Sequence, residues 1–326
     1  MKYTMQILAA ALLATTVAGG PLQKEQVSAD AKWLLHLDVD QLRTTRVGEV
    51  LVKEVLEKNF SEPKMKLKND LGFDLDVSRI SSITAYGSDY GPGRAGKVLL
   101  IKTDLEFQKA LDGAIEKFAS QGDEVPVKKL EGDDAGLYSI HNEVFVAFLP
   151  GHLVAAGRSI GSVKKEAAVL SGKSPNIVSS KTFSQFPGSK KNSFFVASAE
   201  SFNSDATIPP QAQILKMADG GQVVLGERGD NLFLSISLRA KTSEVVTQMQ
   251  QAIQGFLALI SLSQQGNKDL LQLAQSAKVS ADDNIVSLSV EFPADSAIEH
   301  LREQHQHKSH REGDAEAEPE SKKKDQ

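Results

Sequence analysis

The sequence contains no cysteine among its 326 residues. This absence excludes disulfide bonds, a lipid anchor on an N-terminal cysteine, thiol catalysis and zinc sites with cysteine ligands. A basic domain is also missing, because the formal net charge is -5 and the isoelectric point is about 5.9. Proteins that bind nucleic acids concentrate positive charge against the phosphates, so we do not expect a nucleic acid as the main partner.

The beginning of the chain lacks an apolar run long enough for a membrane-spanning helix, which needs ~20 residues. Residues 1–20 carry Lys2, a short apolar run at Met5–Leu13 and small residues at the end. This arrangement is typical of a secretory signal peptide, with cleavage near Ala18–Gly20. The sequence therefore predicts export to the periplasm or beyond, with no membrane span after cleavage. An uncleaved N-terminal anchor is the alternative.

What is present is an ordinary globular composition, with 40% hydrophobic and 24% charged residues. The stretch at 31–42, AKWLLHLDVDQL, predicts a strand followed by a helix. Side chains alternate between the two faces of a strand. We expect one face to pack against helices; its residues are Trp33, Leu35, Leu37 and Val39. We expect the other face to be mostly polar; its residues are Leu34, His36, Asp38 and Asp40.

A similar pattern, SFFVASAESF, occurs at 193–202, which is 160 positions later. At this offset Asp38 aligns with Ser198, and His36 aligns with Val196. The order strand, helix, two strands, helix, then further strands appears after each copy. The sequence therefore predicts an α+β fold made of two related units, each a largely antiparallel sheet with helices packed on one face.

The predicted layout divides the chain into six parts. They are a signal peptide (1–20), a polar leader (21–30), a first α+β unit (31–172), a linker rich in Ser, Lys and Pro (173–191), a second α+β unit (192–302) and a charged tail (303–326). Helices are expected at 41–58, 105–119, 159–171, 242–262, 269–277 and from 295. The tail has almost no large apolar side chains, so we expect it to be disordered.

Two motifs resemble catalytic or nucleotide-binding elements. Gly91, Gly93 and Gly96, followed by Lys97, match glycine-rich phosphate loops. Those loops require a helix directly behind them, and here an apolar strand is expected, so we interpret the motif as a hairpin loop. Ser162 and Lys165 match a serine–lysine pair. We interpret that pair as part of the solvated side of an amphipathic helix, together with Lys164 and Glu166.

Histidines suggest metal sites at two places. On a continued C-terminal helix, His300, Glu303, His307 and His310 would lie on one face, and imidazole suits divalent zinc, copper or nickel. The alternative is a flexible tail with opportunistic metal affinity, which we favour. His36, Asp38 and Asp40 could also ligate a metal ion from one strand face. In the simpler interpretation, His36 is a half-buried strand residue and Asp40 caps the following helix.

The segment at 29–51, which begins ADAKWLLHLDVDQL directly after the signal pattern, resembles the start of uncharacterised exported bacterial proteins with a two-unit α+β layout. The resemblance implies export and no particular activity. Together with the absence of a nucleophile–base set, it favours a non-enzymatic binding or structural protein of the cell envelope that requires no cofactor. Its partner would be an envelope or extracellular protein. The alternatives are metal handling by the histidine cluster, and a hydrolase whose site between the units would combine His36, Asp38, His141 and Glu143.

Overall fold

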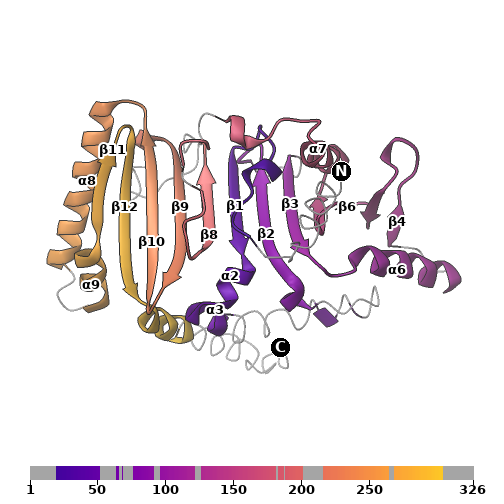
Figure 1. Ribbon diagram of the computed structural model, residues 1–326, viewed down its shortest axis with the longest axis horizontal. Helices are drawn as coiled ribbons and strands as arrows, with labels where there is room; N and C mark the ends of the chain where they lie inside the picture. The colour runs from indigo at the N-terminus through magenta and orange to yellow at the C-terminus, as the bar shows by residue number, and fades with distance from the viewer. Residues whose placement is uncertain are drawn as a thin grey trace, which may run out of the picture.

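The computed structural model describes residues 20–51, 64–65, 68, 76–91, 96–121, 126–180, 183–186, 188–200, 216–263 and 268–303. These residues form one antiparallel sheet of 12 strands, in the order β11-β12-β10-β9-β8-β1-β2-β3-β7-β6-β5-β4 (Figure 1). Helices pack against this sheet, which confirms the predicted α+β class with a largely antiparallel sheet. The predicted boundaries between units remain a prediction of the sequence.

The strands come from both halves of the chain. The first half supplies β1 (Trp33–Asp38), β2 (Ile80–Gly87), β3 (Lys97–Thr103), β4 (Val127–Lys129), β5 (Leu137–Ile140), β6 (Val144–Leu149) and β7 (Leu153–Gly157). The second half supplies β8 (Ser193–Ala199), β9 (Ala218–Arg228), β10 (Asn231–Ala240), β11 (Lys278–Asp282) and β12 (Ile285–Pro293). Both sets are rich in residues that fit a pleated, half-buried surface.

Helices precede, connect or follow these strands in the described part of the chain. They are α2 (Val39–Arg43), α3 (Arg46–Val50), α6 (Phe107–Gln121), α7 (Ile160–Leu170), α8 (Ser243–Ser263), α9 (Lys268–Ser276) and a last helix at 294–303. Short 3-10 helices are η1 (Lys24–Gln26), η3 (Val77–Arg79), η4 (Gly132–Asp134) and η5 (Ile177–Ser179). Among the described residues, none of the helices combines the length and apolar character needed to cross a membrane.

The two matching stretches of sequence are direct neighbours in the sheet, because β1 pairs with β8. His36 pairs with Val196, the residue that the 160-position offset assigns to it. An antiparallel pair in which a residue faces its own equivalent has a local two-fold axis at that point. In each half, moreover, the closing hairpin returns beside the third strand: β7 lies against β3, and β12 lies against β10. The order of strands on either side of the axis therefore corresponds.

The prediction for the two faces of β1 is wrong. Leu35, expected inside, is 44% exposed, whereas His36, expected on the polar outer face, is 3% exposed. Leu34 and Asp38 are buried on the same face as His36. Alternation identifies which residues share a face, but segments distant in sequence decide which face is covered.

Helices cover both faces of the first half of the sheet. Val154 of β7 packs in a cluster with Leu111 of α6, whereas the next residue, Ala155, packs with Val163 of α7. Successive residues of a strand point to opposite faces, so α6 and α7 lie on opposite sides. At the other end of the sheet, α8 packs on β11 and β12 (Figure 1). Phe256, Leu259 and Leu262 of α8 are exposed.

The N-terminal strap, which we define as residues 20–30, and the described parts of the segment 173–191 (173–180, 183–186 and 188–191) contribute to the core rather than serving only as leader and linker. Val27 of the strap and Ile177 of η5 are both fully buried, and Phe183 and Phe186 are nearly so. Their position on the α7 side explains why His36 and Asp38 are inside the protein. Neither segment shows a clear helical or strand periodicity, so no local pattern indicates this packing.

The helix expected at 41–58 is broken at Thr44 and Thr45, and residues 52–58 lie outside the described part of the chain. The Thr45 hydroxyl accepts a hydrogen bond from the Gly48 N–H at 2.9 Å and so begins a second helix, α3. Glu227 of β9 adds a second cap, because its carboxylate accepts from the N–H groups of Arg46 and Val47 at 2.8 and 3.1 Å. A residue of the second half thus holds a helix of the first half.

A buried acid joins α7 to the sheet. The hydroxyl of Tyr86, on β2, donates a hydrogen bond to Oε2 of Glu166. Glu166 is fully buried, which corrects its assignment to the solvated side of the helix. Burial raises the pKa of Glu166 to about 7, and it also raises the pKa of the Tyr86 hydroxyl. The second carboxyl oxygen of Glu166, Oε1, has no hydrogen-bond partner among the described residues. Ionisation of Glu166 is therefore unfavourable in the folded protein.

We expect the change Glu227→Ala to lower the free energy of unfolding by about 1–2 kcal/mol, because two N–H groups at the start of α3 lose their acceptor. Urea denaturation measures this change. Glu291→Ala, which removes an exposed carboxylate from β12, is the matched control and should cost less than about 0.5 kcal/mol. Equal losses for the two variants would show that Glu227 does not stabilise α3.

We expect the wild-type protein to lose stability relative to Glu166→Gln as the pH rises. The folded state holds a proton that the unfolded state releases near pH 4.5, so the stabilisation is complete below that pH and is lost as the pH passes through about 7. The difference should reach about 3 kcal/mol by pH 9. Unfolding of both proteins by urea across pH 4–9 measures it. Parallel pH profiles would contradict the raised pKa.

Candidate functional site

A row of polar side chains crosses the central strands on the face that α7 and the N-terminal strap cover. In the strand register, Asp38 of β1 lies beside Ser82 of β2, which lies beside Lys102 of β3. His36 lies beside Thr84 in the next row. Neighbouring strands are about 4.8 Å apart, so these side chains form one compact group.

His36 is held as a neutral imidazole. Its Nδ1 lies 2.9 Å from the Thr84 hydroxyl, while its Nε2 has no hydrogen-bond partner among the described residues. Burial lowers the pKa of His36 to about 4, although the nearby backbone of Gly20 acts in the opposite direction. A neutral ring fixed by a hydroxyl could act as a base or ligand only if another group reached Nε2.

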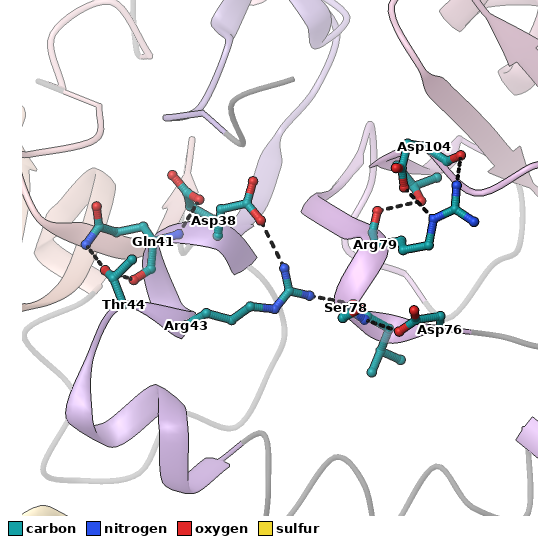
Figure 2. Close-up of polar contacts among 11 residues, drawn as sticks. Asp38, Gln41, Arg43, Thr44, Asp76, Ser78, Arg79 and Asp104 are labelled. Atoms are coloured by element: carbon teal, nitrogen blue, oxygen red, sulfur yellow. Dashed lines mark hydrogen bonds and ion pairs between the residues drawn. The ribbon is translucent and has the colours of Figure 1, made fainter. Parts of the chain in front are cut away.

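Asp38 is engaged in folding the chain. Its carboxylate accepts a hydrogen bond from the Gln41 N–H at 2.9 Å and caps α2 (Figure 2). The expectation that Asp40 forms this cap is therefore wrong by two residues. Burial raises the pKa of Asp38, and the bond from Gln41 partly offsets that effect. Asp38 is both the last residue of β1 and the N-cap of α2, because α2 follows β1 without a connecting loop.

Beyond Asp38, arginines tie the strand ends together (Figure 2). Arg43 of α2 donates to Asp40 Oδ1 at 2.9 Å and to the Val77 carbonyl at 2.5 Å. Arg79 donates to the side chain and the carbonyl of Asp104 at 2.9 and 2.7 Å. These bonds connect α2, η3 and the end of β3. The guanidinium groups act here as structural links between elements.

A groove of about 490 Å³ opens beside this group, between the N-terminal strap, α7 and the turn that joins β6 to β7. Lys102 and Leu153 lie on its strand side, Glu25 on the strap side and Leu170 on the α7 side. Residues of opposite charge and aliphatic residues thus line the same groove. The described lining includes one hydroxyl, that of Ser171, and no histidine.

Lys102 and Glu25 were not singled out from the sequence. A signal for Lys102 exists, because Val98 and Leu100 precede it at two-residue spacing on a buried strand face. A lysine that continues such an alternation is placed where apolar residues are expected. No comparable signal marks Glu25, which reaches the groove only through the position of the strap.

The residues predicted for a hydrolase site are not brought together. His36 and Asp38 share the covered face of β1, but His141 and Glu143 are exposed in the turn between β5 and β6. Four strand spacings, about 19 Å, separate β1 from β6. His141 also has a positive φ of 51°, as expected of a tight turn.

The two sequence motifs have structural roles. Strand β3 begins at Lys97 directly after Gly96, whose φ is +74°, so the glycine motif is a hairpin end, as predicted, with residues 92–95 outside the described part. The Gly96 N–H donates to the Ser162 hydroxyl at 3.1 Å. Lys165 forms an ion pair with Asp30 of the strap at 2.6 Å. Ser162 and Lys165 therefore contact different segments.

The predicted histidine cluster is only partly described. His300 Nδ1 and Glu303 Oε2 lie 3.7 Å apart on the last helix, and both side chains are more than half exposed. His307 and His310 lie outside the described residues. Within the described ranges, no group of three or more potential metal ligands converges. The C-terminal metal site remains a prediction of the sequence.

Comparison with known proteins assigns no family. No protein-family model and no curated protein matches the chain. Among solved structures, crystal form IV of TP0453 is similar at 11% identity and a TM-score of 0.48, covering 88% of this chain and 99% of that one. Crystal form III is similar at 12% identity and a TM-score of 0.47, covering 86% of this chain and 96% of that one. Crystal form I is similar at 11% identity and a TM-score of 0.43, covering 87% of this chain and 98% of that one. Likeness at this level transfers no functional residue to this chain.

Proposed function

We propose that the protein is an exported, non-enzymatic binding protein of the cell envelope that holds a small zwitterionic ligand, such as a short peptide with free termini. The observation that supports this function is the groove beside β3, where Lys102 and Glu25 present opposite charges to one space. Leu153 and Leu170 supply aliphatic surface in the same space for an apolar side chain. Pockets of this kind combine apolar lining with a few polar groups that fix orientation.

The chemistry of the neighbouring residues supports binding over catalysis. Asp38 caps a helix, His36 is bonded to Thr84, and Arg43 and Arg79 link separate elements. A catalytic acid or base must reach the reacting group in its working protonation state. These groups are instead committed to contacts that hold the fold together. Export is supported by the N-terminal pattern of Lys2 followed by the apolar run at Met5–Leu13.

The proposed ligand class is tested with the tripeptide Ala-Leu-Ala carrying free termini. We expect calorimetric titration to give a dissociation constant on the order of 0.1 mM, since a few exposed charge contacts and one aliphatic side chain supply about 5 kcal/mol. The change Lys102→Met should weaken binding about tenfold by removing the contact to the peptide carboxylate. Lys128→Met, on the outer strand β4, is the matched control.

Blocked peptide distinguishes charge recognition from general adhesion. The same tripeptide with an acetylated amino end and an amidated carboxyl end should not bind at comparable concentrations. Equal binding of both forms, or equal affinity of the Lys102→Met and wild-type proteins, would refute the zwitterion site. Chromatography of the peptide after incubation adds a further check, because the appearance of free alanine or leucine would show hydrolysis and contradict a non-enzymatic function.

Export is tested separately by expressing the full chain in a bacterium with a periplasm. We expect osmotic shock to release the protein, and N-terminal sequencing to place its first residue near 19–21. Deletion of residues 5–13 should leave the protein in the cytoplasm at full length. Retention of the intact chain in the cytoplasm, without that deletion, would refute export.

A further inference from the structure

The N-terminal strap is held in the manner of a bound peptide. Leu22 packs against the cluster of Val196, Val224 and Phe233 on the second half of the sheet. The ammonium group of Lys24 donates to the carbonyl oxygens of Phe183 and Phe186, each at 2.8 Å. Val27, fully buried, packs in the first-half core. The rest of the protein therefore contacts three side chains of the strap separately: an apolar residue, a lysine two positions later and an aliphatic residue three positions after the lysine.

The main chain of the strap makes contacts that also resemble peptide binding. The Leu22 N–H donates to the Ser189 hydroxyl at 3.0 Å, and the Ile177 N–H donates to the Val27 carbonyl at 2.9 Å. The Ala29 N–H donates to the Pro175 carbonyl at 3.1 Å. The strap joins no strand of the sheet and has one isolated bridge, between Ser28 and Asn176. A segment held by side-chain packing and separate main-chain bonds, without a strand ladder, opens at lower free energy than the sheet does.

The strap lies over the junction of the two halves. Leu22 contacts the cluster that contains Val196, and Val196 pairs with His36 across the β1–β8 boundary. The Gly20 backbone acts on the buried His36 ring, so the first described residue of the strap lies over the β1 side of the junction, as Leu22 lies over the β8 side.

We propose that the N-terminal strap is a releasable latch over a peptide-binding site at the junction of the two halves, and that the site accepts in trans an extended peptide with the same spacing of apolar, lysine and aliphatic residues. Release exposes Val196 and the Nε2 edge of His36. The site is separate from the groove proposed above, although the strap contributes Glu25 to that groove, and its test does not use the tripeptide ligand.

The absence of cysteine allows a direct test, because Val196→Cys introduces the single thiol of the full chain. The Val196 side chain is buried beneath Leu22, so alkylation reports opening of the strap. Val146→Cys, buried under α6, is the matched control. In native buffer we expect the Val196→Cys protein to react at least tenfold faster than the Val146→Cys protein. Phe233→Cys, in the same cluster, replaces Val196→Cys if circular dichroism shows that variant to be misfolded.

The latch is tested by adding Lys24→Met, which keeps an unbranched side chain one atom shorter than lysine and removes both bonds to the carbonyl groups. We expect this change to accelerate alkylation of Val196→Cys about tenfold, and Lys32→Met, at an exposed position, to leave it unchanged. A synthetic peptide of residues 20–31 should then slow alkylation of the Val196→Cys, Lys24→Met protein, whereas the same peptide with methionine in place of lysine should not.

Two results would overturn the proposal. If alkylation of Val196→Cys is as slow as that of Val146→Cys and is insensitive to Lys24→Met, the strap opens only when the whole protein unfolds. If Lys24→Met accelerates the reaction but the added peptide has no effect at millimolar concentration, the surface beneath the strap does not accept a peptide in trans.

Discussion

Backbone pairing between β1 and β8 is the contact on which the rest of the structure depends. It joins two sets of strands into one sheet of 12 and places the two matching stretches of sequence side by side. Other links between the halves need this pairing to bring their partners into reach. The cap of α3 by Glu227 and the packing of Leu22 on Val196 both span the junction. A ladder of main-chain bonds supports these contacts without requiring particular side chains at the boundary.

Polar residues that would suggest chemistry in isolation are used here to hold the fold. His36 and Asp38 occupy one strand face, yet the first is bonded to Thr84 and the second caps a helix. Burial sets their protonation, because removing a group from water penalises its charged form. The same effect raises the pKa of Glu166 under α7. Lys102 and Glu25, which line the groove from opposite sides, carry the opposite charges on which the proposed binding site depends.

The candidate site could be predicted only in part. Alternation along β1 and β3 placed His36 with Asp38 and could have placed Lys102 on a buried face, because residues two apart always share a face. The groove itself depends on the strap, and nothing local in residues 20–30 indicates that they pack against α7 and η5. The four residues named for a hydrolase site are separated for a related reason. Spacing within a strand is local, but the three strands between β1 and β6, which ends the turn that holds His141 and Glu143, are set by the order of strands in the sheet.

By itself, the sequence determined the identity of most strands, the helices α7 and α8, the hairpin at Gly96 and the 160-position correspondence that the β1–β8 register reproduces. These features follow from periodicity and turn chemistry, which act over a few residues. Only the tertiary structure decided which face of β1 is inside, which aspartate caps α2 and what covers His36. The cap is a local bond from the Gln41 N–H to Asp38 and is set by where β1 ends. The covering of β1 and of His36 depends on contacts between segments more than 100 residues apart, such as Lys24 with Phe183, and no local pattern encodes them.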